Sequence, residues 1–581
     1  MIVLGLNCVF HESSAALVVD GRLLAAAEEE RFNRVKHAKA AAVDNAHVLP
    51  TASIDYCLAE AGVTASQIDA VSYSFDPALR RAQFRVDPLS STGDWGSRSG
   101  EDTFLASLDT VPDAIRQLLD TDVPVTWLRH HLAHAASVYY TSCPDEAAVL
   151  VADGIGENAA TVMFAGAGGE LRVLHETGYP HSIGFLWEKL SAFLGFSPYD
   201  ASKVMGLAGF GDPARYGSAF ADFVHIDGPR YTIDTDILRF RLPSTEPLAE
   251  RLGPPRAAGE PIEQRHADIA ATLQELTNRA MLNLVRDLHA RQPVDDLGLA
   301  GGVALNCTTN HLVKEQGPFT WVHIPSAPHD GGTAIGGALL LAAASRPRSG
   351  RQCSVYTGPA YGDDAGMAAL ATTGMPVERP DDLLAEVTDL LCSGAVVGWF
   401  QGRMEFGPRA LGNRSLLADP RDAGMRDTLN HKVKHREHFR PFAPSVLAEH
   451  AADWFELGRP SPAFEAMLFA PPIRPGLAAR IPAVSHVDGT ARIQLVHREA
   501  NPRFHELISR FHVRTGVPMV LNTSFNDSEP IVCSPADAVR TFLATRIDVL
   551  VLGDLLVRRP AVPTSASNVD QLAADPTPAG V

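Results

Sequence analysis

The sequence predicts an α/β fold with a duplicated first domain, and the alternation of short strands and amphipathic helices is the reason. The chain opens on three apolar strands separated by polar turns, with an Asp20-Gly21 hairpin signal before the third strand. A similar unit recurs near residue 148, and apolar helices follow both units. Strands that alternate with helices indicate α/β layers.

Each unit has three predicted strands, and a turn rich in polar residues or glycine follows the first strand. The strands are predicted at 2–6, 15–19 and 23–27, and again at 148–152, 160–165 and 171–175. Two copies of one unit predict a duplicated domain with a cleft between its halves, in which both turns face one ligand. The alternative is that two three-stranded segments look alike by chance. Periodic apolar positions predict helices at 52–61, 182–193 and 267–290, whereas 87–102 is predicted to be an irregular surface segment.

The chain of 581 residues is long enough for two large domains. A short Pro/Gly/Arg stretch at 345–350 is the predicted linker. We therefore expect a first domain over 1–345 and a second α/β domain over 353–560. The last residues, 561–581, are rich in Pro, Ser, Thr and Ala and are predicted to be a disordered tail.

Charge and cysteine usage limit the possible partners and compartment. The net charge of −18 argues against nucleic acid and anionic membranes as partners. The seven cysteines are sparse and form no C-x-x-C pair, which is typical of reduced thiols. The first residues lack the cationic start of a signal peptide, and the longest apolar run, 334–344, is shorter than the roughly 20 residues of a membrane span. We expect a cytoplasmic protein.

A histidine pair is the clearest candidate metal site. In the run HHLAH, His130 and His134 are spaced i, i+4, so both imidazoles lie on one helical face and suit one metal ion. His131 stands where zinc proteases carry a glutamate, which argues against that class. Asp153, at the end of the next strand, is the nearest plausible carboxylate. The alternative is an ordinary histidine pair in the core or on the surface.

Glycine-rich turns indicate a nucleotide or phosphate site. The run Gly301-Gly302-Val303-Ala304-Leu305-Asn306 joins a predicted strand to a predicted helix start, an arrangement that receives phosphates. Asp330, in the run His329-Asp330-Gly331-Gly332, precedes a helix of small residues. Its alternative role is to cap that helix.

One segment reverses the acidic character of the chain. Between residues 401 and 440 there are nine basic and five acidic residues, with glycines and a proline that indicate tight turns. Few aromatic residues accompany them, so small phosphorylated substrates held by arginine forks fit better than nucleic acid. The alternative is a surface of salt bridges.

Together these motifs resemble those of the NodU/CmcH O-carbamoyltransferases. The likeness covers roughly residues 1–560 and is carried by HESSAA (11–16), HHLAH (130–134), DGIGE (153–157), GGVALN (301–306), HDGG (329–332), EFGPRALGNRS (405–415), FRPFAP (439–444) and NTSFN (522–526). The resemblance implies a first domain similar to TsaD, with the duplicated fold of actin and the heat-shock ATPases, and a second domain similar to YrdC. It implies that the second domain makes carbamoyl-adenylate from carbamoyl phosphate and ATP, and that the first transfers the carbamoyl group to an alcohol.

The resemblance also implies roles for individual residues. His130, His134, Asp153 and Asp330 match metal ligands, with iron(II), Fe²⁺, or another divalent metal as the ion. His11 matches the catalytic histidine beside the carbamoyl group, and Lys36 a nearby lysine. The nucleotide site is expected to use Lys203, Asp153, Gly301, Gly302 and Asn306, with Mg²⁺ accompanying ATP. The phosphates of the second domain are expected to meet Arg403, Arg409, Arg414, Lys434, Arg440 and Asn522.

Two other functions stay open. One is a nucleotide-binding ATPase without group transfer, which leaves the basic segment unexplained. The other is threonylcarbamoyl-type tRNA modification, against which the net charge argues. The acceptor is expected to be a hydroxyl of a small natural product, as in antibiotic tailoring. The stretches 72–102 and 179–212, with Asp76, Asp87, Asp94, Trp95, Tyr199 and Asp200, could attract a cationic amino sugar or could be exposed loops.

Overall fold

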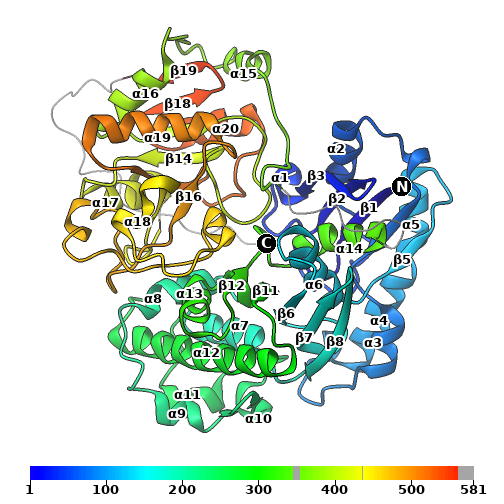
Figure 1. Cartoon of the computed structure of the whole chain (residues 1–581). Helices are drawn as coiled ribbons and strands as arrows, with labels where there is room; N and C mark the ends of the chain where they lie inside the picture. The colour runs from blue at the N-terminus through cyan, green and yellow to red at the C-terminus, as the bar shows by residue number, and fades with distance from the viewer. Residues whose placement is uncertain (344–353, 435, 561–581) are drawn as a thin grey trace, which may run out of the picture.

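The computed structural model describes residues 1–343, 354–434 and 436–560 (Figure 1). The predicted linker at 345–350 and the predicted tail at 561–581 lie outside these residues. The described chain forms two five-stranded sheets, a two-stranded hairpin and a seven-stranded sheet. The predicted α/β class is confirmed.

The first sheet contains an antiparallel meander followed by two parallel strands. Its order is β3-β2-β1-β4-β5, with β1, β2 and β3 antiparallel and β4 and β5 parallel to β1. The strands are β1 (Ile2–Asn7), β2 (Ser14–Val19), β3 (Arg22–Glu28), β4 (Ala70–Tyr73) and β5 (Val125–Trp127). The helices of this first repeat are α1 (Glu30–Asn33), α2 (Thr51–Ala61), α3 (Pro77–Gln83), α4 (Arg98–Asp109), α5 (Val111–Leu119) and α6 (His130–Thr141).

The second sheet repeats this topology. Its order, β8-β7-β6-β11-β12, again has three antiparallel strands and then two strands parallel to the first of them. The strands are β6 (Ala147–Ala152), β7 (Ala159–Ala167), β8 (Glu170–Gly178), β11 (Asp296–Ala300) and β12 (Trp321–His323). The identical order and directions confirm the duplication that the two hairpin units predicted.

The second repeat carries most of its helices between β8 and β11. They are α7 (Ile183–Phe193), α8 (Ala201–Ala208), α9 (Gly217–Ala221), α10 (Thr235–Leu238), α11 (Glu246–Leu252) and the long α12 (Gln264–Arg291), with the hairpin of β9 (Val224–Asp227) and β10 (Arg230–Ile233) among them. After β11 come α13 (Cys307–Gln316) and α14 (Gly332–Ala343).

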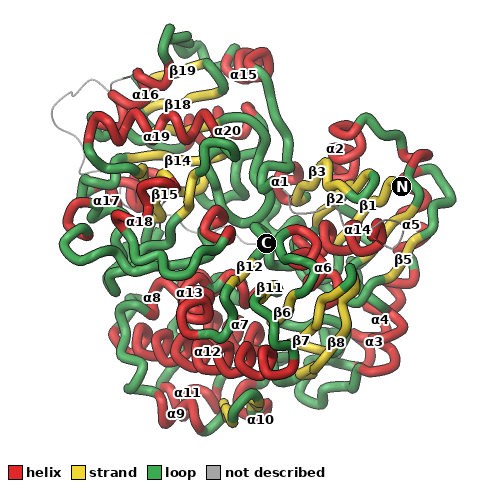
Figure 2. Tube along the Cα trace, viewed as in Figure 1, coloured by secondary structure: helices red, strands yellow, loops and turns green. Residues whose placement is uncertain are grey.

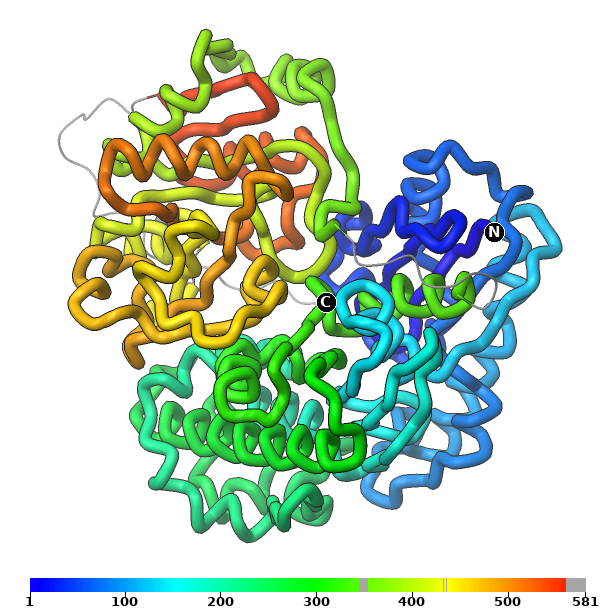
Figure 3. Tube along the Cα trace, viewed as in Figure 1, coloured from blue at the N-terminus to red at the C-terminus, as the bar shows by residue number. Residues whose placement is uncertain are grey.

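The last helix of each repeat packs against the sheet of the other repeat. Helix α14 contacts β1, β2 and β4, whereas α6 contacts β6, β7 and β11, and the two helices also contact each other. In Figure 3 the green segment of α14 accordingly runs beside the blue strands of the first repeat. A Cβ atom on Gly336 would lie 1.9 Å from the carbonyl oxygen of Ala133, so the small residues of α14 permit this close approach.

The last part of the chain is a mixed seven-stranded sheet with helices. Its strand order is β16-β15-β17-β14-β13-β18-β19. The strands are β13 (Val397–Phe400), β14 (Arg414–Ala418), β15 (Ala443–Leu447), β16 (Gln494–Val496), β17 (Met519–Ser524), β18 (Val549–Leu552) and β19 (Leu555–Arg558). The helices include α15 (Asp363–Leu370), α16 (Leu383–Cys392), α17 (Met425–Leu429), α18 (Ala451–Trp454), α19 (Pro502–Thr515) and α20 (Pro535–Ala544). Helices α16 and α19 pack together, as do α15 and α20 (Figure 2).

The apolar core joins this last part to the second repeat. One cluster of buried side chains includes Leu297 and Val322 of the second repeat and Phe464 and Leu468 of the last part. Across the described residues, none of the helices combines the length and the hydropathy that crossing a bilayer requires.

One expectation about local structure is wrong. Part of the segment 87–102, predicted to be irregular, is helical, because α4 begins at Arg98. The Ser97 side chain caps this helix by accepting a hydrogen bond from the Gly100 amide, and Glu101 forms a buried ion pair with Arg80. A Ser/Gly-rich stretch therefore contains a helix start rather than a surface loop.

Candidate metal centre and adjoining arginine cavity

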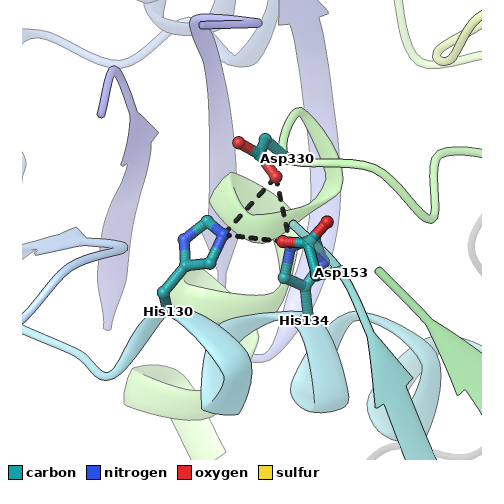
Figure 4. A group of neighbouring side chains, drawn as sticks. All are labelled: His130, His134, Asp153 and Asp330. Atoms are coloured by element: carbon teal, nitrogen blue, oxygen red, sulfur yellow. Dashed lines mark ion pairs between the residues drawn. The ribbon is translucent and has the colours of Figure 1, made fainter. Parts of the chain in front are cut away.

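Four side chains that the sequence places far apart meet between the two repeats (Figure 4). The ligand atoms of His130, His134, Asp153 and Asp330 lie within 4.8 Å of one another, and all four residues are buried. The Nε2 atoms of both histidines lie 3.3 to 3.4 Å from Asp153 Oδ2 and Asp330 Oδ1. Two ligands about 2.1 Å from one tetrahedral ion stand about 3.4 Å apart, so this donor set fits a divalent transition metal.

Neighbouring groups orient these ligands. His130 Nδ1 is 3.0 Å from the Ser74 carbonyl oxygen; donation from that nitrogen leaves Nε2 free to bind a metal. Asp153 Oδ1 accepts a hydrogen bond from the Gly302 amide at 2.9 Å, which leaves Oδ2 toward the histidines. A metal ligand set with such outer partners is held in place before an ion binds.

The electrostatics of the four residues are mutually dependent. Burial disfavours charge on His130 and His134, but Asp153 and Asp330 raise the pKa of both histidines. Burial and the neighbouring Asp153 both act to raise the pKa of Asp330, yet the histidines lower it to about 2. Two carboxylates this close in the interior need cations beside them, and a divalent metal supplies that charge.

Local structure explains how each ligand reaches the cluster. His130 and His134 occupy the first two turns of α6, Asp153 directly follows β6, and Asp330 stands two residues before α14. The Asp330 carboxylate does not cap α14. The Thr333 amide donates to the Asp330 backbone oxygen, whereas the Asp330 side chain faces the histidines. His131 lies between the two histidine ligands in the sequence. A Cβ atom built on Gly156 would lie 2.6 Å from the Nδ1 atom of His131.

A cavity of about 530 Å³ adjoins the cluster, and we call it the metal-side cavity. His11 and Glu12, from the turn after β1, line it together with Asp153, Gly154 and Ile155, from the turn after β6. The two turns therefore face one cavity, as the duplicated units predicted. Its aromatic wall is formed by Phe10, Trp95, Phe185, Trp187 and Tyr199.

His11 is placed to act on a ligand in this cavity. Its Nδ1 has no hydrogen-bond partner in the described part of the chain, and its ring lies 4.9 Å from that of Tyr199. Glu12, next in sequence, lies 2.5 Å from His329 Nδ1 and 3.3 Å from His37 Nδ1. Burial acts against charge on Glu12, but His329 holds the pKa of this carboxyl well below its usual range.

Lys36, the expected partner of His11, is exposed and is not among the residues that line the cavity. His37, its neighbour, lines the cavity instead, with its ring 5.6 Å from that of His11. No role was predicted for His37, Glu12 or His329, although each is adjacent to a residue for which a role was predicted.

A second cavity of about 550 Å³ lies between the second repeat and the last part of the chain, and we call it the arginine cavity. Arg409, Arg436, Arg440 and Arg492 line one side, together with Asn522. The opposite side is formed by α8, α12 and α13 through Gly206, Gln274, Asn278, Cys307 and Thr308.

Several guanidinium nitrogens in this cavity lack partners. Among the described residues, Arg409 Nε, Arg436 Nη2 and Arg492 Nε are buried without a hydrogen bond, whereas Arg436 Nε donates to Asn430 Oδ1 and Arg440 pairs with Glu437 at 3.9 Å. Burial and the neighbouring arginines lower the pKa of Arg409 and of Arg436 to about 9, which is the mark of cations held together without enough counter-charge. Unpaired arginine forks around a cavity of this size fit a small polyanion.

The two cavities adjoin each other. Ser202, Met205, Pro408 and Arg409 line both of them. Pro408 and Arg409 belong to the GPR run of the second domain, whereas Ser202 and Met205 lie on α8 of the first. The two cavities therefore share part of their walls.

Of the six residues expected to hold phosphates in the second domain, Arg409, Arg440 and Asn522 line the arginine cavity. Arg403 instead donates to the carbonyls of Leu24 and Thr357. Arg414 is fully buried against the Phe400 ring and donates to backbone carbonyls, including that of Gln401. Both side chains therefore bind backbone carbonyls, and neither lines the arginine cavity.

Lys434 is buried beneath the cavity wall. Its Nζ donates to the backbone oxygens of Ser524 at 2.5 Å and of Asn526 at 2.8 Å. Arg492 was not predicted as a site residue, because it lies 52 residues beyond the end of the basic segment at Arg440 and no local cluster of charge marks it.

The expected nucleotide residues divide between several roles. Asn306 lines the metal-side cavity, but its Oδ1 caps α13 through the Thr309 amide at 3.0 Å. Gly302 binds Asp153, and Gly301 has a φ of +89° with no room for a Cβ beside Ala152. Lys203 pairs with Asp200 at 3.0 Å and Glu437 at 3.4 Å and lines neither cavity.

Comparison with known proteins agrees with both halves of this arrangement. Residues 2–339 match the family model described as Carbamoyltransferase N-terminus, and residues 388–559 match the one described as Carbamoyltransferase C-terminus. The chain belongs to the carbamoyltransferase family. This confirms the resemblance stated above and the expected enzyme class, an O-carbamoyltransferase.

Relatives extend over most of the chain. The nodulation protein NolNO of Sinorhizobium fredii is 39% identical over 95% of this chain and 80% of its own length. The 3'-hydroxymethylcephem-O-carbamoyltransferase of Amycolatopsis lactamdurans is 34% identical over 62% of this chain and 65% of its own. Among solved structures, full-length HypF in its phosphate- and nucleotide-bound form is 12% identical, with a TM-score of 0.33, over 60% of this chain and 56% of that one.

Proposed function

We propose that this carbamoyltransferase works in two steps, one at each cavity. The part at 353–560, to which the resemblance assigns a YrdC-like fold, makes carbamoyl-adenylate at the arginine cavity. The part at 1–345, to which it assigns a TsaD-like fold, transfers the carbamoyl group to an alcohol at the metal-side cavity. The observation that carries the proposal is that a cavity with unpaired arginines adjoins a cavity with a buried His/Asp cluster and a free histidine.

In the first step the arginines hold the phosphate oxygens of carbamoyl phosphate and of ATP, which carries Mg²⁺. Water cleaves carbamoyl phosphate to carbamate and phosphate, and a carbamate oxygen then attacks the α-phosphorus of ATP while pyrophosphate leaves. Arg409, Arg440 and Arg492 stabilise the negative charge that develops on the phosphoryl oxygens. Among the described residues, Arg409 Nε and Arg492 Nε are buried without a hydrogen-bond partner, which supports this role because bound phosphates would complete their hydrogen bonds.

In the second step the acceptor oxygen attacks the carbamoyl carbon and AMP leaves. His11 accepts the proton of the alcohol, since its buried Nδ1 has no hydrogen-bond partner among the described residues and an imidazole nitrogen can act as a general base. A divalent metal, iron(II) by the resemblance, would be held by His130, His134, Asp153 and Asp330 and would neutralise phosphate charge or act as a Lewis acid. Because the adenylate is labile in water, adjoining cavities also limit its hydrolysis.

The acceptor is proposed to be a hydroxyl of a small natural product. Of the residues expected to attract an amino sugar, Asp94, Trp95 and Tyr199 line the metal-side cavity. Asp76 caps α3, Asp87 accepts the Tyr179 hydroxyl, and Asp200 pairs with Lys203. Of the acids expected in these stretches, Asp94 thus reaches the cavity, whose lining also includes Glu12, Asp153, Glu188 and Asp330. ATP and carbamoyl phosphate as substrates, and cysteines that are all unpaired among those described, support a cytoplasmic location.

The test separates the two steps. Pyrophosphate release from ATP is expected only when carbamoyl phosphate is added, and mass spectrometry of a panel of alcohols is expected to show a product heavier by one carbamoyl group. Chelation of the protein-bound metal with Mg²⁺ kept in excess, or Asp330→Asn, should abolish transfer and spare pyrophosphate release, whereas Arg409→Ala should lower pyrophosphate release at least about tenfold and leave the metal content unchanged. Loss of both activities on metal removal would contradict the division into two sites.

A further inference from the structure

One short helix of the first repeat reaches the loop that separates the two cavities. Arg31, on α1, is 4% exposed, and its Nη2 donates to the backbone oxygen of Gly407 at 2.8 Å. Gly407 directly precedes Pro408 and Arg409, the two residues of the second domain that line both cavities.

Arg31 is itself fixed by two carboxylates. Its Nη2 lies 2.6 Å from Glu28 Oε2, and its Nη1 lies 2.7 Å from Glu30 Oε1. Burial opposes charge on Arg31, but Glu28 and Glu30 raise its pKa above the ordinary value. A guanidinium can satisfy two carboxylates and a carbonyl at once because its donors form a rigid planar fork.

The same group of charges continues to the wall of the metal-side cavity. Glu28 Oε1 is 3.5 Å from His329 Nε2, and His329 Nδ1 is 2.5 Å from Glu12, which lines that cavity. Charged side chains therefore connect the turn after β1 to the backbone of Gly407 without a gap.

The Gly407 segment has little freedom of its own. Gly407 has a φ of +115°, and a Cβ atom there would come within 2.6 Å of the Ser326 carbonyl oxygen. The segment thus lies directly on the chain that leads to Asp330, and its backbone conformation favours glycine. Its position depends on contacts with the first domain, of which the Arg31 hydrogen bond is one.

We propose that Arg31 is a positioning residue that holds the Gly407–Arg409 segment against the first domain, so that the Arg409 guanidinium stands at the wall shared by the two cavities. The proposal rests on the proposed function only in that Arg409 binds phosphate. Arg31 itself lines neither cavity and touches no substrate; it acts through the Gly407 carbonyl.

Arg34 provides a matched control on the same turn of chain. Its guanidinium donates to the carbonyls of Ile531 at 2.7 Å and Pro530 at 2.5 Å, so it also joins the first domain to the second. Neither of these acceptors, nor Arg34, lines a cavity. The pair Arg31→Lys and Arg34→Lys keeps both charges, so Glu28 and Glu30 stay paired, and removes one guanidinium fork at a time.

The measurement uses the full chain and inorganic pyrophosphate as the probe. We expect Arg31→Lys to weaken pyrophosphate binding about tenfold by calorimetry, and to raise the KM for ATP more than it lowers kcat for pyrophosphate release. Metal content and Tm should match those of Arg34→Lys, which should bind pyrophosphate within about twofold of the wild type. Arg31→Gln should show a larger loss than Arg31→Lys.

The outcomes distinguish the two claims. If the wild type, Arg31→Lys and Arg34→Lys all bound pyrophosphate with the same affinity, the positioning role would be overturned and the proposed function would stay intact. Absence of pyrophosphate binding by the wild type would overturn the proposed function and the positioning role with it. If Arg31→Lys lost metal and thermal stability in parallel with affinity, Arg31 would be a structural residue and the positioning role would be wrong.

Discussion

Glu188 shows how the metal-side cavity perturbs a single carboxyl. It lies on α7 and lines the cavity, where burial raises its pKa to about 8, with Asp153 and Asp330 adding to the effect and Arg241 opposing it. Between pH 4.5 and 8 the folded protein therefore keeps a proton that the unfolded chain releases. Stability should fall as pH rises through this window.

We predict that Glu188→Gln removes this pH dependence. Between pH 5 and pH 9 the wild type should lose about 3–5 kcal/mol more of its free energy of unfolding than the variant does, because glutamine does not ionise. Urea denaturation at both pH values measures the difference. Glu170→Gln, at an exposed glutamate on β8, is the control and should follow the wild type. Equal losses in all three proteins would contradict the prediction.

At the residue scale, sequence spacing predicted the site residues that lie together on one element. It did not identify the site residues that different elements bring together in space. His130 and His134 were readable because four residues separate them on one helix, and His11 because it stands in a recognisable run. Arg492 and His329 carry no such mark: Arg492 reaches the arginine cavity from a segment without other basic residues, and His329 matters through Glu12 and Glu28, which are distant in sequence.

The small residues of helix α14 determine how closely this helix packs against α6, which carries two of the candidate metal ligands. The expected Cβ of Gly336 would overlap the Ala133 carbonyl oxygen, which belongs to the residue before His134. Any side chain at this position must push α6 and α14 apart.

We predict that Gly336→Ala destabilises the protein by about 2–3 kcal/mol and lowers its metal content, since α6 carries two of the four ligands. Thermal unfolding and elemental analysis of the purified variant measure both effects. Gly217→Ala is the matched control, because no atom lies within 4 Å of a Cβ built there. Retention of full metal content by a destabilised Gly336→Ala would show that the cluster does not depend on this contact.

At the scale of elements, periodicity was a good guide where an element is apolar on one face. All six strands predicted for the two units are present, each longer than expected by up to three residues at an end. Helix α4 was missed because its beginning, in a Ser/Gly-rich run, is set by a side-chain cap and by the ion pair of Glu101 with Arg80, neither of which has a periodic signature.

The whole molecule is joined by its ligand cavities as well as by its core. The arginine cavity takes its lining from both the second repeat and the last part, which also share one cluster of buried apolar side chains. A ligand in that cavity should therefore stabilise both parts together.

We predict that inorganic pyrophosphate at about 100 times its dissociation constant adds about 2.7 kcal/mol to the free energy of unfolding. The protein should show a single calorimetric transition, and pyrophosphate should raise its midpoint temperature. Differential scanning calorimetry with and without pyrophosphate tests this. Arg409→Ala, which removes a lining guanidinium, should reduce the increase. Two separate transitions, of which only one moves, would show that the parts unfold independently.

At this scale the duplication and the basic segment 401–440 could be predicted, because repeated strand units and a cluster of basic residues are both visible in one dimension. That the two cavities share Met205 and Arg409 could not be predicted, since it depends on how α8 meets Pro408 and Arg409 in space. The predicted boundaries at 345–350 and 561 lie outside the described residues and stay predictions.

The exchange of α6 and α14 between the sheets has a consequence for biosynthesis. Helix α14 packs on β1, from which it is separated by more than 320 residues of chain, and Asp330 lies two residues before it. On the ribosome, the first repeat must therefore wait for nearly all of the second before the face of its sheet under α14 is covered, and contacts of such long range form slowly. A nascent or truncated chain that ends before Asp330 lacks one of the four ligands, so the complete four-ligand site requires nearly the whole duplicated domain.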